Sequence, residues 1–240
     1  MSIASYSVVA VAIILASCMQ ASIGFGMGML AAPIVAIVDP GLIPGTLIML
    51  ATLLTLVVVI KERQEIDLAG TGWALAGRVP GTVAGALLLA ALPERVLAMA
   101  LAGVVLAGVA LTSSGWVPVP HRRNLVLAGA TSGVLGTATS IGGPPMALVW
   151  QKTTGARLRG TMSGFFLVGS VMSIVVLTFT GAVDGRTVSS FAALIPAVAA
   201  GYVLSRTVNH LLDPRRQRWA AIVISAVGAI VLIARQLVGF

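Results

Sequence analysis

Cysteine, histidine and acidic residues are scarce in this chain of 240 residues, and each shortage excludes a kind of site. A single cysteine, Cys18, excludes a disulfide framework and a cysteine-based metal site. Two histidines, His121 and His210, are too few for a metal centre. The seven carboxylates all fall in predicted loops or at predicted helix ends: Asp39, Glu62, Glu65, Asp67, Glu94, Asp184 and Asp213. We therefore expect no enzyme, no catalytic residue, no buried proton relay, and neither a metal nor a cofactor.

Apolar residues dominate the composition instead. Hydrophobic residues make up 58% of the chain and charged residues 9%, and the mean hydropathy is +1.05. These values are typical of a polytopic membrane protein. The net charge of +8 would suggest a nucleic-acid partner in a soluble protein. In a membrane protein it indicates cytoplasmic loops, where Lys and Arg collect, so we expect a lipid bilayer and no nucleic acid as partner.

The N-terminal apolar run contains a sequence that resembles a lipoprotein cleavage site, Leu15-Ala16-Ser17-Cys18. No Lys or Arg precedes this run, and no soluble domain follows it. We therefore expect the segment to be retained as a membrane helix.

Apolar runs between polar or Pro/Gly breaks predict two sets of five helical segments. The first set is 3–20, 25–38, 44–60, 70–91 and 95–113, and the second is 124–139, 144–151, 160–180, 188–208 and 218–236. The sets predict two membrane repeats, 1–115 and 124–240, joined by a cytoplasmic linker at 116–123. Each repeat would contain a broken or re-entrant first helix pair and three spanning helices.

The first helix pair of each repeat is interrupted at an equivalent place. The interruptions are Ser22-Ile23-Gly24-Phe25-Gly26-Met27-Gly28 and, 118 positions later, Ser140-Ile141-Gly142-Gly143-Pro144-Pro145. The repeat is also visible in Val57-Val58, which recurs as Val175-Val176, and in Pro80 and Gly85, which recur as Pro196 and Gly201. The segments beside each break are shorter than the ~20 residues of a spanning helix. Paired breaks of this kind predict a transporter's binding site near the bilayer midplane.

The distribution of Lys and Arg favours inverted repeats. If each broken stretch enters the membrane and returns, eleven cations share one face and three, Arg95, Arg186 and Arg235, lie on the other. The eleven are Lys61, Arg63, Arg122, Arg123, Lys152, Arg157, Arg159, Arg206, Arg215, Arg216 and Arg218. If each stretch crosses once, the split is eight against six. The positive-inside rule therefore predicts inverted repeats, with the eleven-residue face in the cytoplasm and the N-terminus outside.

The breaks offer the chemistry of an anion site. A helix that starts within the membrane presents unpaired N–H groups and a partial positive charge. Glycines let a ligand approach the backbone, hydroxyl and amide groups add donors, and Pro suits a helix start. The predicted substrate-binding residues at the breaks are Gln20, Ser22, Gly24, Phe25, Gly26, Met27, Gly28, Thr139, Ser140, Gly142, Gly143 and Pro144. The alternative is that Gly24 and Gly28 form a small-xxx-small packing surface.

Arg78 completes the predicted substrate-binding set, because it is the one charged residue well inside a predicted span. An ionisable residue at that depth indicates a role in binding or in the transport path. A long Arg side chain can also extend to the cytoplasmic interface, and that alternative stays open at this point.

The two broken motifs resemble those of a known transporter family. Residues 20–33, Gln-Ala-Ser-Ile-Gly-Phe-Gly-Met-Gly-Met-Leu-Ala-Ala-Pro, resemble the first Gly-rich motif of the TauE/SafE sulfite exporters, also called the toluene sulfonate uptake permease family. Residues 139–148, Thr-Ser-Ile-Gly-Gly-Pro-Pro-Met-Ala-Leu, resemble the second. The first motif departs from the plainer Gly-Gly-Gly form through Phe25 and Met27, which predicts a more apolar pocket.

This resemblance covers nearly the whole chain and implies a function. It implies export of a small sulfur-containing anion, sulfite or an organosulfonate, by a secondary transporter or facilitator, and a possible homodimer. In this interpretation the anion binds between the breaks, and rocking of the repeats alternates access to it. An anion channel and an importer of a sulfonate or carboxylate remain the alternatives.

Overall fold

The structure is a computed structural model that describes residues 3–113, 118–211, 227, 230, 233 and 234. Five described helices are long and apolar enough to cross a membrane: α1 (Ile3–Ile23), α3 (Gly45–Glu62), α4 (Leu68–Ala91), α8 (Gly155–Phe179) and α9 (Gly185–Leu211). The others are α2 (Met27–Val38), α5 (Glu94–Ser113), α6 (Arg122–Thr139) and α7 (Gly143–Val149), with 3-10 turns η1 (Pro40–Leu42) and η2 (Arg63–Glu65). The predicted all-α polytopic membrane class is confirmed.

The predicted segments match the helices to within about three residues except at α8, which begins at Gly155 and not at 160, and the length of the first helix also changes its interpretation. The first helix continues to Ile23 and has 21 residues, so the expectation that it is too short to span was wrong. It continues because Ser22 and Ile23 keep helical geometry and the chain turns only at Gly24. The helices after the breaks are short, with 12 residues in α2 and seven in α7. Most of the predicted segment 218–236 and part of the linker lie outside the described residues, and the division into two repeats stays a prediction.

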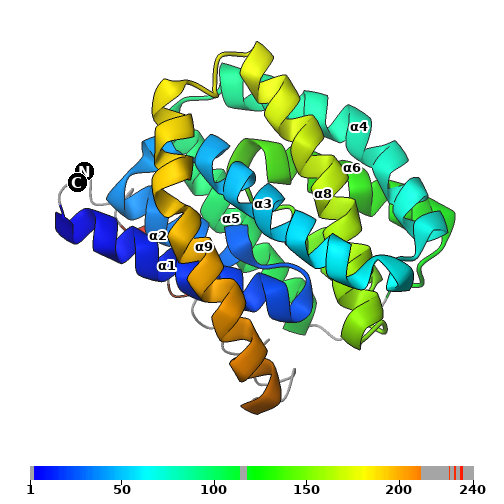
Figure 1. The fold of residues 1–240 in the computed structure, drawn as a ribbon. Coiled ribbons are helices and arrows are strands. Elements are labelled where there is room, and N and C mark those ends of the chain that lie inside the picture. Colours follow the sequence, from blue (N-terminus) through cyan, green and yellow to red (C-terminus); the bar gives the residue numbers. More distant parts are fainter. Residues whose placement is uncertain (1–2, 114–117, 212–226, 228–229, 231–232, 235–240) are drawn as a thin grey trace.

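The five long helices and α6 form a layer in which each packs on the next, in the order α6, α4, α8, α3, α9 and α1 (Figure 1). Under the sequence offset, α1 corresponds to α6 and α4 corresponds to α9. The packed pair α1 and α9 therefore corresponds to the packed pair α6 and α4. In each pair the first helix of one predicted repeat packs on a later helix of the other repeat. Thr52 on α3 hydrogen-bonds Ser170 on α8 at 2.8 Å, and these residues are themselves 118 positions apart. The predicted repeat axis would pass near this bond.

Glycines bring α4 and α6 into close backbone contact. A Cβ atom at Gly77, Gly81 or Gly129 would overlap a backbone carbonyl oxygen of the facing helix. A Cβ at Gly85 would lie 2.5 Å from the Val134 oxygen. Small residues spaced by four positions allow this approach in membrane helices, where dispersion contacts stabilise the pair. The close packing at these glycines fixes the position of Arg78, which follows Gly77 directly on α4.

Charged residues divide between the two ends of the helix layer. Among the described residues, one end carries eight cationic and three acidic residues, the cations being Lys61, Arg63, Arg122, Arg123, Lys152, Arg157, Arg159 and Arg206. We call this the basic end. The opposite end carries Arg95, Arg186 and three acidic residues. One ion pair joins helices at each end, Glu62 to Arg159 at 2.8 Å and Asp39 to Arg186 at 2.7 Å.

Candidate anion site

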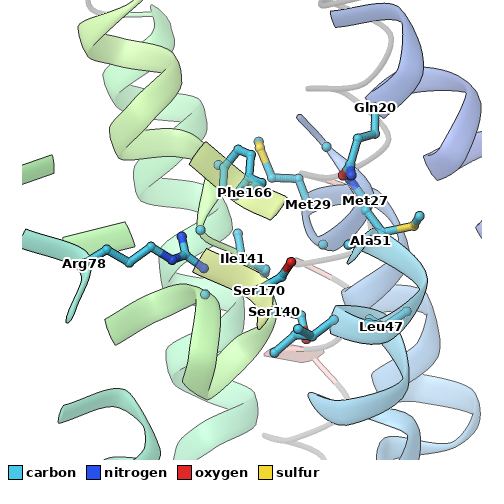
Figure 2. Close-up of a pocket in the computed structure, with 16 residues that line it drawn as sticks. Gln20, Met27, Met29, Leu47, Ala51, Arg78, Ser140, Ile141, Phe166 and Ser170 are labelled. Atoms are coloured by element: carbon cyan, nitrogen blue, oxygen red, sulfur yellow. The ribbon is translucent and has the colours of Figure 1, made fainter. Parts of the chain in front are cut away.

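The two breaks meet at a cavity of about 50 Å³ in the interior of the molecule (Figure 2). We call it the central cavity. Its wall comes from the α1–α2 and α6–α7 junctions, from α3 and α8, and from Arg78 on α4. The volume is several times the ~10–15 Å³ that one water molecule needs, so a small anion fits. Segments that are more than a hundred positions apart thus contribute to one site.

Eight of the thirteen predicted site residues line the central cavity: Gln20, Gly26, Met27, Gly28, Arg78, Ser140, Gly142 and Gly143. Ser22, Gly24, Phe25, Thr139 and Pro144 lie outside its wall. The hydroxyls of Ser22 and Thr139 donate hydrogen bonds to carbonyl oxygens one turn earlier in their own helices, each at 2.7 Å. Phe25 packs beside Gly143, where an added Cβ would lie 3.2 Å from its ring. These five residues shape the breaks from behind the cavity wall.

The first break depends on two glycines in conformations that L side chains rarely adopt. Gly24 has φ 88° and Gly26 has φ 128°. A side-chain amide replaces the lost helical bonds, because Gln20 Oε1 accepts from the Met27 N–H at 3.0 Å. The N–H groups of Gly28 and Met29 follow in the first turn of α2, where helix geometry supplies no backbone acceptor. Both residues line the central cavity.

The second break is built differently. Its left-handed residue is Ser140, with φ 64°, and the Ser140 hydroxyl donates to the Pro44 carbonyl at 3.1 Å. Gly142 has an ordinary φ of −91°, but a Cβ there would lie 2.8 Å from Ser132 Oγ. The helix that follows, α7, begins with Gly143 and two prolines and therefore has few free N–H groups. The starts of α2 and α7, which were predicted to match, thus differ in the number of N–H groups that they leave free.

Arg78 enters the central cavity from the side opposite Gln20 and Met27 (Figure 2). Only 3% of Arg78 is exposed, so its side chain is buried in the protein and does not extend to the membrane interface. Its Nη1 donates to Ser132 Oγ at 3.0 Å, and Ser132 Oγ donates to the Gly142 carbonyl at 2.6 Å. Arg78 is therefore tied to the second break.

Aromatic rings surround the rest of the Arg78 guanidinium. Its centre lies 4.9 Å from the Phe165 ring and 5.7 Å from the Phe166 ring. Its Nε–H is buried and has no hydrogen-bond partner within the described part of the chain. Neither the Glu62–Arg159 pair nor the Asp39–Arg186 pair involves Arg78. A cation thus lies in the interior without a carboxylate from the described part of the chain.

The sequence-based prediction missed Ser132, Phe166, Ser170 and Gly169. Gly169 gives the guanidinium room, because a Cβ there would overlap the Arg78 side chain. Ser170 lines the central cavity, and its repeat equivalent, Thr52, was not among the predicted site residues, so the offset gave no signal for it. Ser132 lies one turn from Gly129 and Gly136 on a helix of ordinary appearance, and no sequence signal marked it.

A family model described as "Sulfite exporter TauE/SafE" matches residues 9–232, which is most of the chain. The chain belongs to the TauE/SafE sulfite exporter family. This confirms the resemblance of the two motifs, and it makes the chain a membrane transporter of the sulfite exporter class rather than an enzyme. No curated protein and no solved structure matches the TauE/SafE chain significantly.

The chemistry of the central cavity fits an anionic substrate of a TauE/SafE transporter. The cavity combines one guanidinium, the Ser170 hydroxyl, first-turn N–H groups of α2 and an apolar wall that includes Met29 and Phe166. Guanidinium and backbone N–H groups are preferred donors to oxyanions. The described residues contain no group of three His, Cys, Asp or Glu that could hold a metal ion.

Proposed function

We propose that this TauE/SafE transporter exports sulfite or an organosulfonate across the cytoplasmic membrane and binds the anion in the central cavity. The observation that carries the proposal is Arg78, a buried cation beside both breaks with no acidic partner among the described side chains. Burial of an unpaired charge is costly, so such groups persist where a ligand or a path needs them. A bound oxyanion would neutralise the charge of Arg78.

The remaining donors of the cavity would complete the anion site. The N–H groups of Gly28 and Met29 supply hydrogen bonds around an oxyanion, and the Ser170 hydroxyl, which donates to the Leu167 carbonyl at 3.1 Å, would add one by leaving that bond. Met27, Met29 and Phe166 would cover an organic tail, and Phe25 would support that wall from behind. The other predicted residues, Ser22, Gly24, Thr139 and Pro144, would act through the shape of the breaks.

The charge distribution supports a cytoplasmic basic end and an N-terminus outside. In this orientation the repeats are inverted, and rocking of one against the other would open the central cavity to each face in turn. The ion pairs Glu62–Arg159 and Asp39–Arg186 join the predicted repeats at opposite ends, where such a motion must break contacts. Outward movement of an anion is favoured by ~2.3 kcal/mol per charge per 100 mV, so coupling to an ion is not required. A homodimer stays a prediction.

Sulfite flux from proteoliposomes tests the proposed substrate. Wild type should give saturable sulfite efflux that methanesulfonate inhibits and acetate does not. Arg78→Gln should lower kcat/KM at least tenfold, because the anion loses its counter-charge, while Arg123→Gln removes an exposed cation and should leave the flux unchanged. Inhibition by acetate alone would contradict the substrate class, and flux that does not saturate would favour a channel.

A further inference from the structure

A second cavity, of about 650 Å³, opens at the basic end beneath the central cavity. We call it the antechamber. The starts of three helices line it: α4 through Asp67 and Gly70, α6 through Arg122, and α8 through Thr154 and Arg157. Each helix start carries partial positive charge, so three dipoles converge on one space. Its volume lies within the range of small-molecule sites.

The charged side chains of the antechamber reinforce this potential. Arg122, Lys152 and Arg157 face a single carboxylate, Asp67, whose Oδ1 already accepts from the Gly70 N–H at 3.0 Å. The residue before α8, Thr154, provides no side-chain cap, so that helix start keeps donors for a ligand. Low-dielectric walls around one sign of charge concentrate ions of the other sign. The antechamber therefore attracts anions.

Trp150 connects the antechamber to the central cavity. Trp150 lines the antechamber at the end of α7, and the start of α7, Gly143, lines the central cavity. Seven residues of helix span only ~10 Å. The Trp150 ring packs edge-on against Phe165 at 6.2 Å, and Phe165 in turn contacts Arg78. The buried Trp150 Nε1–H has no hydrogen-bond partner among the described residues.

We infer that the antechamber is a second anion-binding site, where the sulfur oxyanion is held before it passes Trp150 and Phe165 into the central cavity. This inference rests on the proposed function. The antechamber is wider than the central cavity and carries more positive charge. Both properties favour capture of a dilute anion from the basic face. The headgroup of an acidic phospholipid shares the same oxyanion chemistry, and the experiment separates the two sources.

The test compares two double variants that each remove two cations from the basic end. Lys152→Gln with Arg157→Gln alters the antechamber, and Lys61→Gln with Arg206→Gln alters a neighbouring cavity at the same end. Sulfite flux is measured in inside-out and right-side-out vesicles, at low and high salt. Reconstitution uses phosphatidylcholine alone or with phosphatidylglycerol.

The antechamber variant should raise the KM for sulfite at least fivefold from the basic face alone, with kcat retained, and should reduce the salt dependence of KM. The effect should be the same in both lipids, and the control variant should stay within twofold of wild type. An unchanged KM, or an equal rise in both double variants, would overturn the site. An effect confined to phosphatidylglycerol would assign the cavity to lipid instead. Absence of sulfite flux in wild type would contradict the proposed function itself.

Discussion

The two breaks have similar sequences, but glycine serves a different purpose in each. In the first break Gly24 and Gly26 supply backbone angles, with φ of 88° and 128°. In the second break Gly142 has an ordinary φ and supplies space, because Ser132 leaves no room for a Cβ. The second break takes its one positive φ at Ser140, which is not a glycine. The two motifs therefore form the wall of one cavity in different ways, and Arg78 is hydrogen-bonded through Ser132 to the second break alone.

Gly28→Ala should have the largest effect, because it acts where the two breaks touch. A Cβ at Gly28 would overlap the Ser140 carbonyl oxygen, and neither backbone can yield without moving its break. We expect loss of sulfite transport and a free energy of unfolding lowered by ~3 kcal/mol or more. Thermal unfolding and flux measure both effects. Gly72→Ala, which has open space around it, is the control, and equal behaviour of the two variants would contradict the contact.

Gly26→Ala and Gly142→Ala test whether each glycine is needed for its backbone angle or for the absence of a side chain. Each should lower the free energy of unfolding by roughly 1–3 kcal/mol, Gly26→Ala through backbone strain and Gly142→Ala through the clash with Ser132 Oγ. Adding Ser132→Ala should recover part of the Gly142→Ala loss. Met19→Ala removes the flexible side chain next to Gly26. Adding it to Gly26→Ala should recover little of the lost stability, because the backbone strain remains. Thermal unfolding of the single and double variants measures both effects. Recovery of stability in Gly26→Ala with Met19→Ala, but not in Gly142→Ala with Ser132→Ala, would contradict the roles given to the two glycines.

Gln20→Glu tests whether the first break faces the anion. Glutamate keeps an oxygen to accept from the Met27 N–H, so the fold should be preserved. The added negative charge beside the central cavity should weaken sulfite binding about tenfold, or ~1.4 kcal/mol. Gln20→Ala should give the opposite profile, with a destabilised fold from the unsatisfied N–H. Calorimetric titration with sulfite separates these outcomes, and unchanged affinity in Gln20→Glu would remove Gln20 from the site.

Ser140→Gly should have the smallest effect. Glycine relieves the positive φ of 64° but loses the hydrogen bond to the Pro44 carbonyl. These contributions of ~1 kcal/mol each oppose one another, so the midpoint of thermal unfolding should shift by no more than a few degrees. A large destabilisation would mean that the Ser140 hydroxyl, rather than its backbone angle, defines the second break.

The sequence alone predicted the helices well, because apolar runs and Pro/Gly breaks act locally. The paired breaks are visible as a repeat, and the structure brings both to the central cavity, while its role as a binding site stays a prediction. The direction of Arg78 could not be predicted, because it depends on how closely Gly77 and Gly81 let α4 approach α6. The long first helix was missed because nothing before Gly24 marks its end. The antechamber was missed because its three helix starts come together only in the folded chain.

Equilibrium binding of sulfite to Arg78→Gln tests the central claim most directly. Calorimetric titration of the purified protein should show binding at least tenfold weaker than in wild type, because the buried cation beside both breaks is lost. Without sulfite the variant should be as stable as wild type or more so, since an unpaired buried charge has been removed. Affinity equal to that of wild type, with the fold intact, would contradict an anion site at Arg78.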